Sequence, residues 1–320
     1  MKTPESNYVF GPVPSRRLGR SLGIDPVPFK TCSYDCIYCQ LGRTTCKTTE
    51  RKEYVPLEDV INELQSKLST RPDYITLSGS GEPSLYSRMG ELIDHIKAMT
   101  NVPVAVLTNG SLLWDQTVRG QLMNADLVIP SLDAGDEAMF RVVNRPHEDI
   151  SFEKMLEGLI DFRREFQGQY CLEVFLLAGH NAITAEVEKL ADCVRLIKPD
   201  LTQLNTATRP TAEEYATAVQ RPRLNELVAM FNPPAEVVAD FRDAHQHREF
   251  AAGSDSVMDL LRRRPCSIED IADGLGMHRN EVVKYVEELT SRKLLEQQLV
   301  DGKSYYKAKQ RTNPYTSEDR

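Results

Sequence analysis

Short apolar runs alternate with amphipathic stretches over the first 250 residues of the chain. The runs are rich in β-branched residues and almost continuously apolar, which is typical of parallel strands covered on both faces. They lie at 21–25, 74–79, 103–110, 126–134, 171–179 and 201–206. Between them, stretches such as 56–68 and 183–197 repeat apolar residues at helical spacing. Six β–α units in succession predict an α/β fold with a parallel sheet and right-handed crossovers.

Two architectures satisfy this alternation. We favour a partial (β/α)6-type TIM barrel, in which the loops after each strand would carry the active site. A doubly wound open sheet is the alternative, because hydrophobic periodicity does not distinguish the two.

A different pattern follows a linker at 250–256. Three short helices are predicted within 256–265, 267–277 and 278–295, and a β-hairpin with Asp301-Gly302 at its tip comes next. Three helices and a hairpin within about sixty residues form the winged helix-turn-helix pattern. Ser267 and Asp270 are spaced as a capping arrangement at the start of the second helix.

The chain therefore divides into a core domain at 1–250, a small winged helix-turn-helix domain at 251–310 and a disordered tail at 311–320. The third predicted helix would be the recognition helix, with groove-facing candidates at His278, Arg279, Asn280 and Lys284. Three glutamates share that helix, and residues 254–310 carry ten basic and ten acidic side chains, whereas DNA-reading domains are usually basic. Both a nucleic-acid and a protein partner remain open for this domain.

Net charge and the lengths of the apolar runs indicate which partners and which cellular compartment to expect. The net charge of −8 argues against a general nucleic-acid binder, although residues 1–53 are locally basic, with nine Lys/Arg against five Asp/Glu. Residues 1–12 lack the apolar run of a secretion signal, and no later run reaches membrane-spanning length. We therefore expect a cytoplasmic protein without a membrane partner, in a compartment that keeps thiols reduced.

Three of the seven cysteines, Cys32, Cys36 and Cys39, lie within eight positions. An odd cluster in a reducing compartment indicates metal binding or catalysis rather than disulfides. A structural zinc site needs four ligands, no histidine is near, and completing the set with Cys46 gives an unusual spacing. Three thiolates on a four-iron cluster leave one iron open for chemistry. We favour the cluster, keep zinc as the alternative, and expect Cys46 not to bind.

The C-x3-C-x2-C spacing, with Tyr38 before its last cysteine, resembles the signature of the radical S-adenosylmethionine (radical SAM) superfamily. The run "LSGSGEPSLY" after the second strand resembles that family's glycine–glycine–glutamate motif, at Gly79, Ser80, Gly81 and Glu82. The resemblance implies that a [4Fe-4S] cluster on the three cysteines binds S-adenosylmethionine, whose ammonium meets this motif. An external electron donor of flavodoxin or ferredoxin type would reduce the cluster, and reductive cleavage would give a 5′-deoxyadenosyl radical.

Polar residues at later strand ends extend the candidate cofactor site. The resemblance implies Ser131 and Asp133 for the ribose and Asn205 for the adenine, with Asn109 as a further candidate. An Asn or Asp that satisfies the loop backbone is the structural alternative at each position.

Arginines are the candidates for substrate contact, because their planar guanidinium groups suit carboxylate or phosphate recognition. Arg16 and Arg17, with Arg20 nearby, are predicted to surround the mouth of the barrel and hold an anionic substrate. Arg145 in "NRPH" and Arg209 in "ATRP" each stand beside a proline after a strand. For each arginine, a solvated loop residue is the alternative.

A wider set of motifs over residues 8–245, including "NRPH" and "QLNTATRP", resembles the radical SAM branch grouped with the wyosine-forming tRNA enzymes. Those enzymes carry further N-terminal cysteines or an equivalent substrate-binding lysine arrangement, and they lack a winged helix. No cysteine precedes Cys32 here. The resemblance therefore carries over the cofactor chemistry and not the substrate.

The leading hypothesis is a radical SAM enzyme that acts on an unidentified substrate. One alternative is a tRNA- or RNA-modifying radical SAM enzyme, with the winged helix holding RNA. Another is a cluster-bearing transcriptional sensor, in which the winged helix binds DNA and no turnover occurs. The enzyme is favoured because ligand candidates recur at successive strand ends, which a sensor does not require.

Overall fold

The computed structural model describes residues 8–238, 253–300 and 302–309. The chain forms two compact units, Met1–Ala244 and His245–Arg320. The predicted domain boundary at 250/251, the first residues of the predicted linker and the predicted tail at 311–320 lie outside the described residues.

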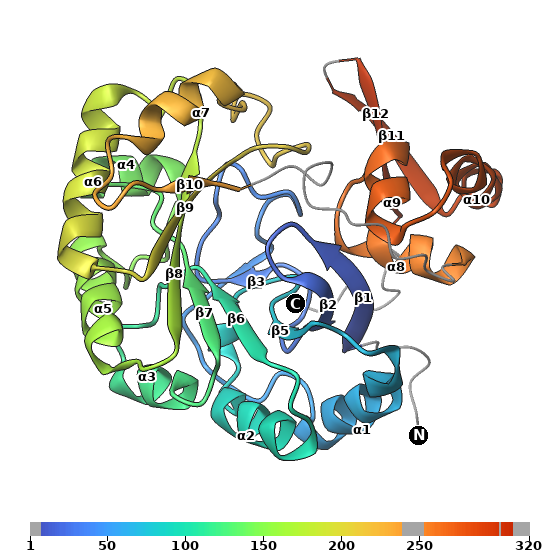
Figure 1. Cartoon of the computed structure of the whole chain (residues 1–320), viewed down its shortest axis with the longest axis horizontal. Helices are drawn as coiled ribbons and strands as arrows, with labels where there is room; N and C mark the ends of the chain where they lie inside the picture. The colour runs from blue at the N-terminus through green and yellow to red at the C-terminus, as the bar shows by residue number, and fades with distance from the viewer. Residues whose placement is uncertain (1–7, 239–252, 301, 310–320) are drawn as a thin grey trace, which may run out of the picture. The chain divides into compact units, whose positions relative to one another are not determined.

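An eight-stranded sheet forms the larger unit (Figure 1). Its strands, in sheet order, are β1 (Val9–Ser15), β2 (Gly19–Ile24), β5 (Tyr74–Leu77), β6 (Val104–Thr108), β7 (Leu127–Pro130), β8 (Gln169–Leu176), β9 (Leu201–Thr206) and β10 (Glu236–Val237). Only β1 runs antiparallel to its neighbour, and every other pair is parallel. The six predicted strands are confirmed. The order of the described strands follows the chain without reversal, so the doubly wound alternative is wrong.

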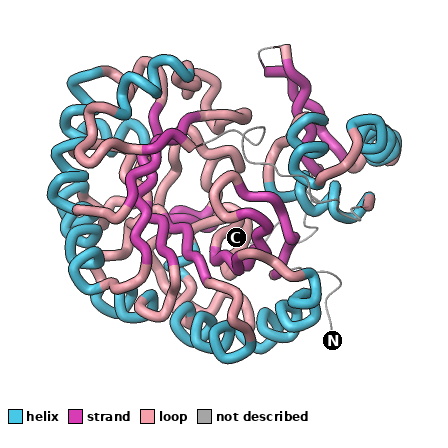
Figure 2. The backbone as a smooth tube through the Cα atoms, in the orientation of Figure 1, coloured by secondary structure: helices cyan, strands magenta, loops and turns pink. Residues whose placement is uncertain are grey.

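Helices lie in an arc along one side of this sheet (Figures 1 and 2). They are α1 (Leu57–Lys67), α2 (Met89–Met99), α3 (Gln116–Leu122), α4 (Glu137–Val143), α5 (Phe152–Glu165), α6 (Thr184–Ile197) and α7 (Arg221–Val228), with 3-10 turns η1 (Leu68–Thr70) and η2 (Pro83–Leu85). The helices predicted at 56–68 and 183–197 correspond to α1 and α6. Side-chain caps begin several of them, such as Ser151, whose hydroxyl accepts from the Lys154 amide at the start of α5.

Successive residues along the strands pack on opposite faces of the sheet. Val104, Val106 and Val128 belong to the large apolar cluster shared with the helices. Ala105, Leu127 and Ile129 belong to a separate, smaller cluster. Because side chains alternate along a strand, the smaller cluster lies on the face of the sheet turned away from the helices.

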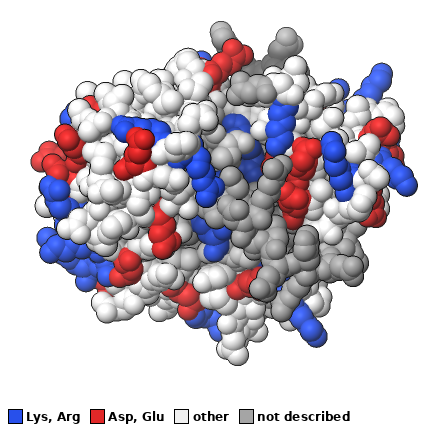
Figure 3. Space-filling view, turned by 45° about the horizontal axis from the view of Figure 1, so that its top comes forward, with Lys and Arg blue, Asp and Glu red and all other residues white. Residues whose placement is uncertain are grey.

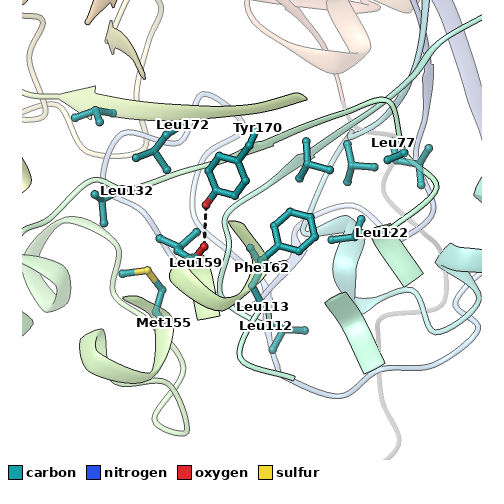
Figure 4. Packing of buried hydrophobic residues seen from close by; sticks show 14 of the residues in the cluster. Leu77, Leu112, Leu113, Leu122, Leu132, Met155, Leu159, Phe162, Tyr170 and Leu172 are labelled. Atoms are coloured by element: carbon teal, nitrogen blue, oxygen red, sulfur yellow. Dashed lines mark hydrogen bonds between the residues drawn. The ribbon is translucent and has the colours of Figure 1, made fainter. Parts of the chain in front are cut away.

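The large cluster is close-packed around aromatic rings (Figure 4). Phe162 stacks on Phe166 with ring centroids 4.9 Å apart, and the buried Tyr170 hydroxyl donates to the Leu159 carbonyl oxygen at 3.4 Å. This layer fixes the strands whose carboxyl ends carry the polar candidates.

A small parallel ribbon, β3 (Thr31–Cys32) with β4 (Cys46–Lys47), stands apart from the main sheet. It closes the segment that contains the cysteine triplet into a loop. This ribbon, β1 and β10 were not predicted from the hydrophobic pattern.

The smaller unit contains α8 (Ser254–Arg263), α9 (Ile268–Leu275), α10 (Arg279–Ser291), β11 (Leu295–Val300) and β12 (Lys303–Ala308). The two strands form an antiparallel hairpin, and the described turn residue Gly302 has a φ of +74°. Ser267 and Asp270 form a reciprocal capping box at the start of α9, as predicted. The predicted order of three helices and a hairpin is therefore present.

The described helices include none that is long and apolar enough to cross a membrane. Basic and acidic side chains are interspersed on the face of the molecule that Figure 3 shows.

Candidate active site

The cysteine loop runs from Lys30 to Lys47 and is closed at its base by the β3–β4 ribbon. The Lys30 carbonyl oxygen accepts from the amides of Thr45 and Cys46, and the Cys32 carbonyl oxygen accepts from the Thr48 amide. Farther along, the Ile37 amide donates to the Val143 carbonyl oxygen at the end of α4. The loop is thus held at two places by backbone hydrogen bonds.

Each of the three cysteine sulfurs receives an N–H donor from a side chain. The side-chain nitrogen Nδ2 of Asn109 lies 3.5 Å from Cys32 Sγ, and Nδ2 of Asn144 lies 3.5 Å from Cys36 Sγ. Lys30 Nζ lies 3.2 Å from Cys39 Sγ. Donors of this kind orient thiolate ligands and stabilise their negative charge.

The turn at Gly79–Glu82 packs directly on the base of the cysteine loop. The Lys30 amide donates to the Ser80 carbonyl oxygen at 2.7 Å, and the Glu82 amide donates to the Thr31 carbonyl oxygen at 3.0 Å. A Cβ atom at Gly81 would lie 1.9 Å from that Thr31 oxygen, so only glycine permits this approach. The turn and the cysteine loop therefore form one structural unit.

Side-chain contacts fix the conformation of the same turn. The Ser80 amide and hydroxyl both donate to the Asp25 carboxylate, at 3.0 and 2.6 Å. The Glu82 carboxylate accepts from the Thr108 hydroxyl at 2.6 Å and from the backbone amide of Asn109 at 2.7 Å. Burial raises the pKa of Glu82. Glu82 thus ties the turn to the carboxyl end of β6.

Asp133 joins the fourth strand end to the cysteine loop. Its Oδ2 accepts from the Tyr38 hydroxyl and from the Asn144 side chain, and its Oδ1 accepts from the Phe175 amide. The Tyr38 ring stacks on Phe175, with ring centroids 4.0 Å apart. Burial raises the pKa of Asp133 to about 6. The structure therefore brings Tyr38 and Asp133 together, and their predicted contacts with the adenosyl group stay predictions.

The two remaining polar candidates at strand ends, Ser131 and Asn205, both lie beside Glu173 of β8. Ser131 is half-buried and forms a parallel bridge with Glu173, while Asn205 is buried and its side-chain nitrogen lies 3.5 Å from Glu173 Oε2. Glu173 is a polar residue on this face that the sequence analysis did not single out. A single charged residue within the apolar run 171–179 was the available signal.

Arg16 and Arg17 stand on the turn before β2, at the amino end of that strand. From there Arg17 forms an ion pair with Glu173, and an Arg16 nitrogen lies 3.2 Å from Asn205 Oδ1. The nearby Arg20 donates to the Thr70 carbonyl oxygen at 2.7 Å. Contact of Arg16 and Arg17 with a substrate at the mouth of the barrel stays a prediction.

Arg145 is engaged in an ion-pair junction. Its guanidinium donates to Glu213 at 2.6 Å and to the Tyr215 hydroxyl at 2.8 Å, and Arg43 reaches the same glutamate at 2.9 Å. This junction links the cysteine loop to the segment after β9. Arg209 is half-buried in that same segment. Substrate contact by either arginine stays a prediction.

Arg145→Gln should lower the melting temperature by about 2–4 °C while leaving cluster assembly intact, because the junction anchors the loop from outside. Arg145 lowers the pKa of Glu213 below its ordinary value of 4.5. The stabilisation is therefore complete above pH 4.5 and is lost as the pH falls below it, so the difference between variant and native protein should shrink in acid. Thermal unfolding followed by circular dichroism at several pH values measures this.

Arg141→Gln is the matched control. Arg141 and Glu137 both lie in α4 and form an exposed i,i+4 ion pair. It should leave the melting temperature unchanged. An Arg145→Gln protein that melts like the native one would contradict the anchoring role.

Three residues that hold the site were missed from the sequence. Lys30 directly precedes Thr31-Cys32, Asn144 directly precedes the flagged Arg145, and Asp25 ends the first predicted strand run. Adjacency to a motif was the signal in the first two cases. The contacts themselves depend on tertiary structure.

The donor set of the cysteine loop fits an iron–sulfur cluster. All seven cysteines are free thiols, and three of them share one loop with an N–H donor at each sulfur. Burial raises the pKa of Cys32 to about 12, so a metal must displace the thiol proton to bind. In the described part of the chain, no three His, Cys, Asp or Glu side chains converge closely enough to hold one metal ion. The fit therefore rests on the thiols and their donors.

A cavity of about 570 Å³ is lined by a different set of residues. They are Thr49, Arg51, Leu112, Trp114, Asp115, Thr117, Asp149 and Lys154. Lys154 Nζ lies 3.6 Å from the centre of the Trp114 ring and covers that face. None of the predicted cofactor or substrate residues lines this cavity, so the candidate site is defined by the cysteine loop instead.

Comparison with known proteins identifies a family for this chain. The Radical SAM superfamily profile matches residues 27–194, which include the cysteine loop and the Gly79–Glu82 turn. A UPF0026 protein of Methanocaldococcus jannaschii is 38% identical over 227 residues, covering 70% of each chain. The crystal structure of a radical SAM methyltransferase from Sphaerobacter thermophilus superposes with a TM-score of 0.50 over 68% of this chain and 65% of that one. At 16% identity, this likeness supports the fold alone.

A protein of Brachyspira hyodysenteriae named GTPase Obg is 40% identical over 303 residues. The match covers 93% of this chain but only 45% of that protein. A nucleotide-binding P-loop requires a glycine five positions before its Gly-Lys-Ser. Here Gly302-Lys303-Ser304 lies in the β11–β12 hairpin, and Gln297 occupies that position. The protein of Methanocaldococcus jannaschii shows that the chain is related to the UPF0026 proteins. The profile match over more than half of the chain shows that it belongs to the radical SAM superfamily.

Proposed function

We propose that the protein is an enzyme that cleaves S-adenosylmethionine reductively at a [4Fe-4S] cluster and uses the resulting 5′-deoxyadenosyl radical to modify a substrate not yet identified. One observation carries the proposal. Three free thiols on one loop each receive a side-chain N–H donor, and that loop packs on a glycine-containing turn.

The chain's own residues would hold the two cofactors in place. Cys32, Cys36 and Cys39 ligate three irons, and the exposed Cys46 does not. The turn at Gly79–Glu82 approaches the methionyl group, because its small residues leave the backbone accessible. Glu82, already buried and hydrogen-bonded, supplies the negative charge for the ammonium.

The strand ends would receive the adenosyl group. Ser131 and Asp133 contact the ribose, with Asp133 also holding Tyr38 at the cluster loop. Asn205 contacts the adenine. Asn109 orients Cys32 through its amide nitrogen and completes this side of the site.

The curvature and order of the sheet support a partial (β/α)6 barrel. Seven strands run parallel in chain order, from β2 to β10, and the helices lie on one side (Figures 1 and 2). In such a barrel the reactive groups gather in the loops after the strands. The cysteine loop and the Gly79–Glu82 turn both follow strands in this way.

Anaerobic reconstitution and reduction with dithionite test the proposal. We expect the reconstituted protein to bind four irons per chain and to release 5′-deoxyadenosine and methionine from S-adenosylmethionine, detected by mass spectrometry. A protein with a complete cluster and no 5′-deoxyadenosine after reduction would refute the enzyme and favour the transcriptional sensor.

The C-terminal unit is proposed to be a winged helix-turn-helix that binds a partner. On α10, Val282, Val286 and Leu289 are buried, whereas His278, Arg279, Asn280 and Lys284 are exposed. Exposed glutamates share that surface, and Arg279 lies 3.3 Å from Glu269. This mixed charge favours a protein partner over DNA. Crosslinking in cell extract with nuclease digestion separates the two, because RNA or DNA enrichment would support the nucleic-acid alternatives.

Three further assignments belong to the same proposal. A flavodoxin- or ferredoxin-type protein supplies the electron, and the wyosine-related branch is the proposed place within the superfamily. The cytoplasm is the proposed location, because free thiols persist in a reducing compartment.

A further inference from the structure

Lys30 is a buried lysine whose side chain ends at a proposed cluster ligand. Its residue is only 3% exposed, and its Nζ lies 3.2 Å from Cys39 Sγ. Within residues 8–238, 253–300 and 302–309, the Lys30 ammonium donates to Cys39 Sγ, and no carboxylate forms an ion pair with it. Burying an ammonium is costly unless a negative group compensates it. The Cys39 sulfur is the group placed to compensate it, and it carries a negative charge when it binds a metal as a thiolate.

The backbone of Lys30 is fixed by both halves of the site. The φ of Lys30 is +59°, in the left-handed region, which residues other than glycine rarely adopt. Its amide donates to Ser80 in the Gly79–Glu82 turn, and its carbonyl oxygen accepts from Thr45 and Cys46 at the ribbon. The contacts that hold the proposed cofactor loops together therefore also hold this unusual conformation and direct the lysine.

Lys30 differs in charge from the other two sulfur donors. Asn109 and Asn144 are neutral amides, and each also donates to a closer oxygen acceptor, Ser33 Oγ at 2.9 Å and Asp133 Oδ2 at 2.7 Å. Lys30 brings a full positive charge to the third sulfur at a shorter distance. Opposite charges interact strongly in a site shielded from water.

We propose that Lys30 is a positioning and tuning residue that raises the reduction potential of the cluster. The inference rests on the proposed function, since it needs a cluster on Cys39. Reduction adds one electron from a low-potential donor, the donor loses one electron, and no bond or proton of Lys30 changes. The reduced cluster is one unit more negative, so a fixed ammonium beside its thiolate stabilises it more than the oxidised form.

The consequence is a division of labour among the three donors. The two asparagines orient their cysteines, and Lys30 makes the cluster easier to reduce. A weaker physiological donor then suffices to reduce it.

Lys30→Met tests the inference, because methionine keeps length and apolar stem while removing the charge. The protein is reconstituted anaerobically and its one-electron midpoint potential is measured by EPR-monitored titration. We expect the reduction equilibrium to become at least tenfold less favourable, about 59 mV more negative for a one-electron couple. Lys30→Arg should restore most of the shift.

Lys97→Met is the matched control, because it removes a lysine that pairs with Asp126 at the amino end of the sheet. It should leave the potential unchanged. Equal potentials for native, Lys30→Met and Lys97→Met proteins would overturn the inference while leaving the proposed function standing. Loss of the cluster in Lys30→Met, Lys30→Gln and Lys30→Arg alike would assign Lys30 to the scaffold and also overturn it. A native protein that assembles no cluster would instead overturn the proposed function.

Discussion

Cys36→Ala protein, reconstituted with iron and sulfide, should contain no stable four-iron cluster and should form no 5′-deoxyadenosine. Cys36 is central to the loop, and its sulfur accepts from Asn144, which is itself fixed by Asp133. Only two thiolates then remain, so two of the four irons have no protein ligand. Two protein ligands are too few for the cluster to persist. Iron analysis, the visible absorbance of the cluster and product mass spectrometry measure this loss.

Cys46→Ala provides the control within the same loop. Cys46 is exposed on β4, opposite Thr31 in the small ribbon, and should be dispensable for both cluster and turnover. A Cys36→Ala protein with four irons, or a Cys46→Ala protein without them, would show that the ligand set is wrongly assigned.

Gly81→Ala should weaken S-adenosylmethionine binding more than tenfold and destabilise the protein by about 1–3 kcal/mol. The added methyl group would meet the Thr31 carbonyl oxygen at 1.9 Å, and a backbone atom cannot rotate away as a side chain can. The turn and the cysteine loop must therefore separate. Isothermal titration of the reconstituted protein and chemical unfolding measure the two effects.

Gly120→Ala is the matched substitution. Gly120 lies in α3, and a Cβ there meets no atom within 4 Å. Alanine should stabilise the helix by about 0.5–1 kcal/mol and leave binding unchanged. Similar binding by the Gly81→Ala and native proteins would mean that the close approach of turn and loop is not needed for the cofactor.

The central strands could be predicted because they are buried on both faces and are therefore almost continuously apolar. β1 could not, since its prolines and glycine interrupt the run, and β10 is only two residues long. The order of strands also needed the structure, because periodicity reports burial and not neighbours. The smaller unit was predictable because its capping box and its glycine turn are local signals.

The candidate site divides in the same way. Cys32, Cys36 and Cys39 are close in sequence, so a metal or cluster site could be predicted from the chain. Asn144 is 108 positions from the cysteine it contacts, and Glu173 is 156 positions from Arg17, so neither contact is visible along the chain. The contacts of Arg16 and Arg17 were likewise not visible along the chain, because the β1–β2 hairpin itself was not foreseen.

The ends of the open sheet bear on how the protein behaves at high concentration. An exposed strand edge offers unpaired N–H groups to other chains and so promotes aggregation. β1 contains Pro12 and Pro14, which have no N–H to offer, and its register shifts between Phe10 and Val13. β10, at the other edge, has only two residues. Among the described residues, both edges of the sheet thus offer few backbone groups to which a strand of another chain could pair.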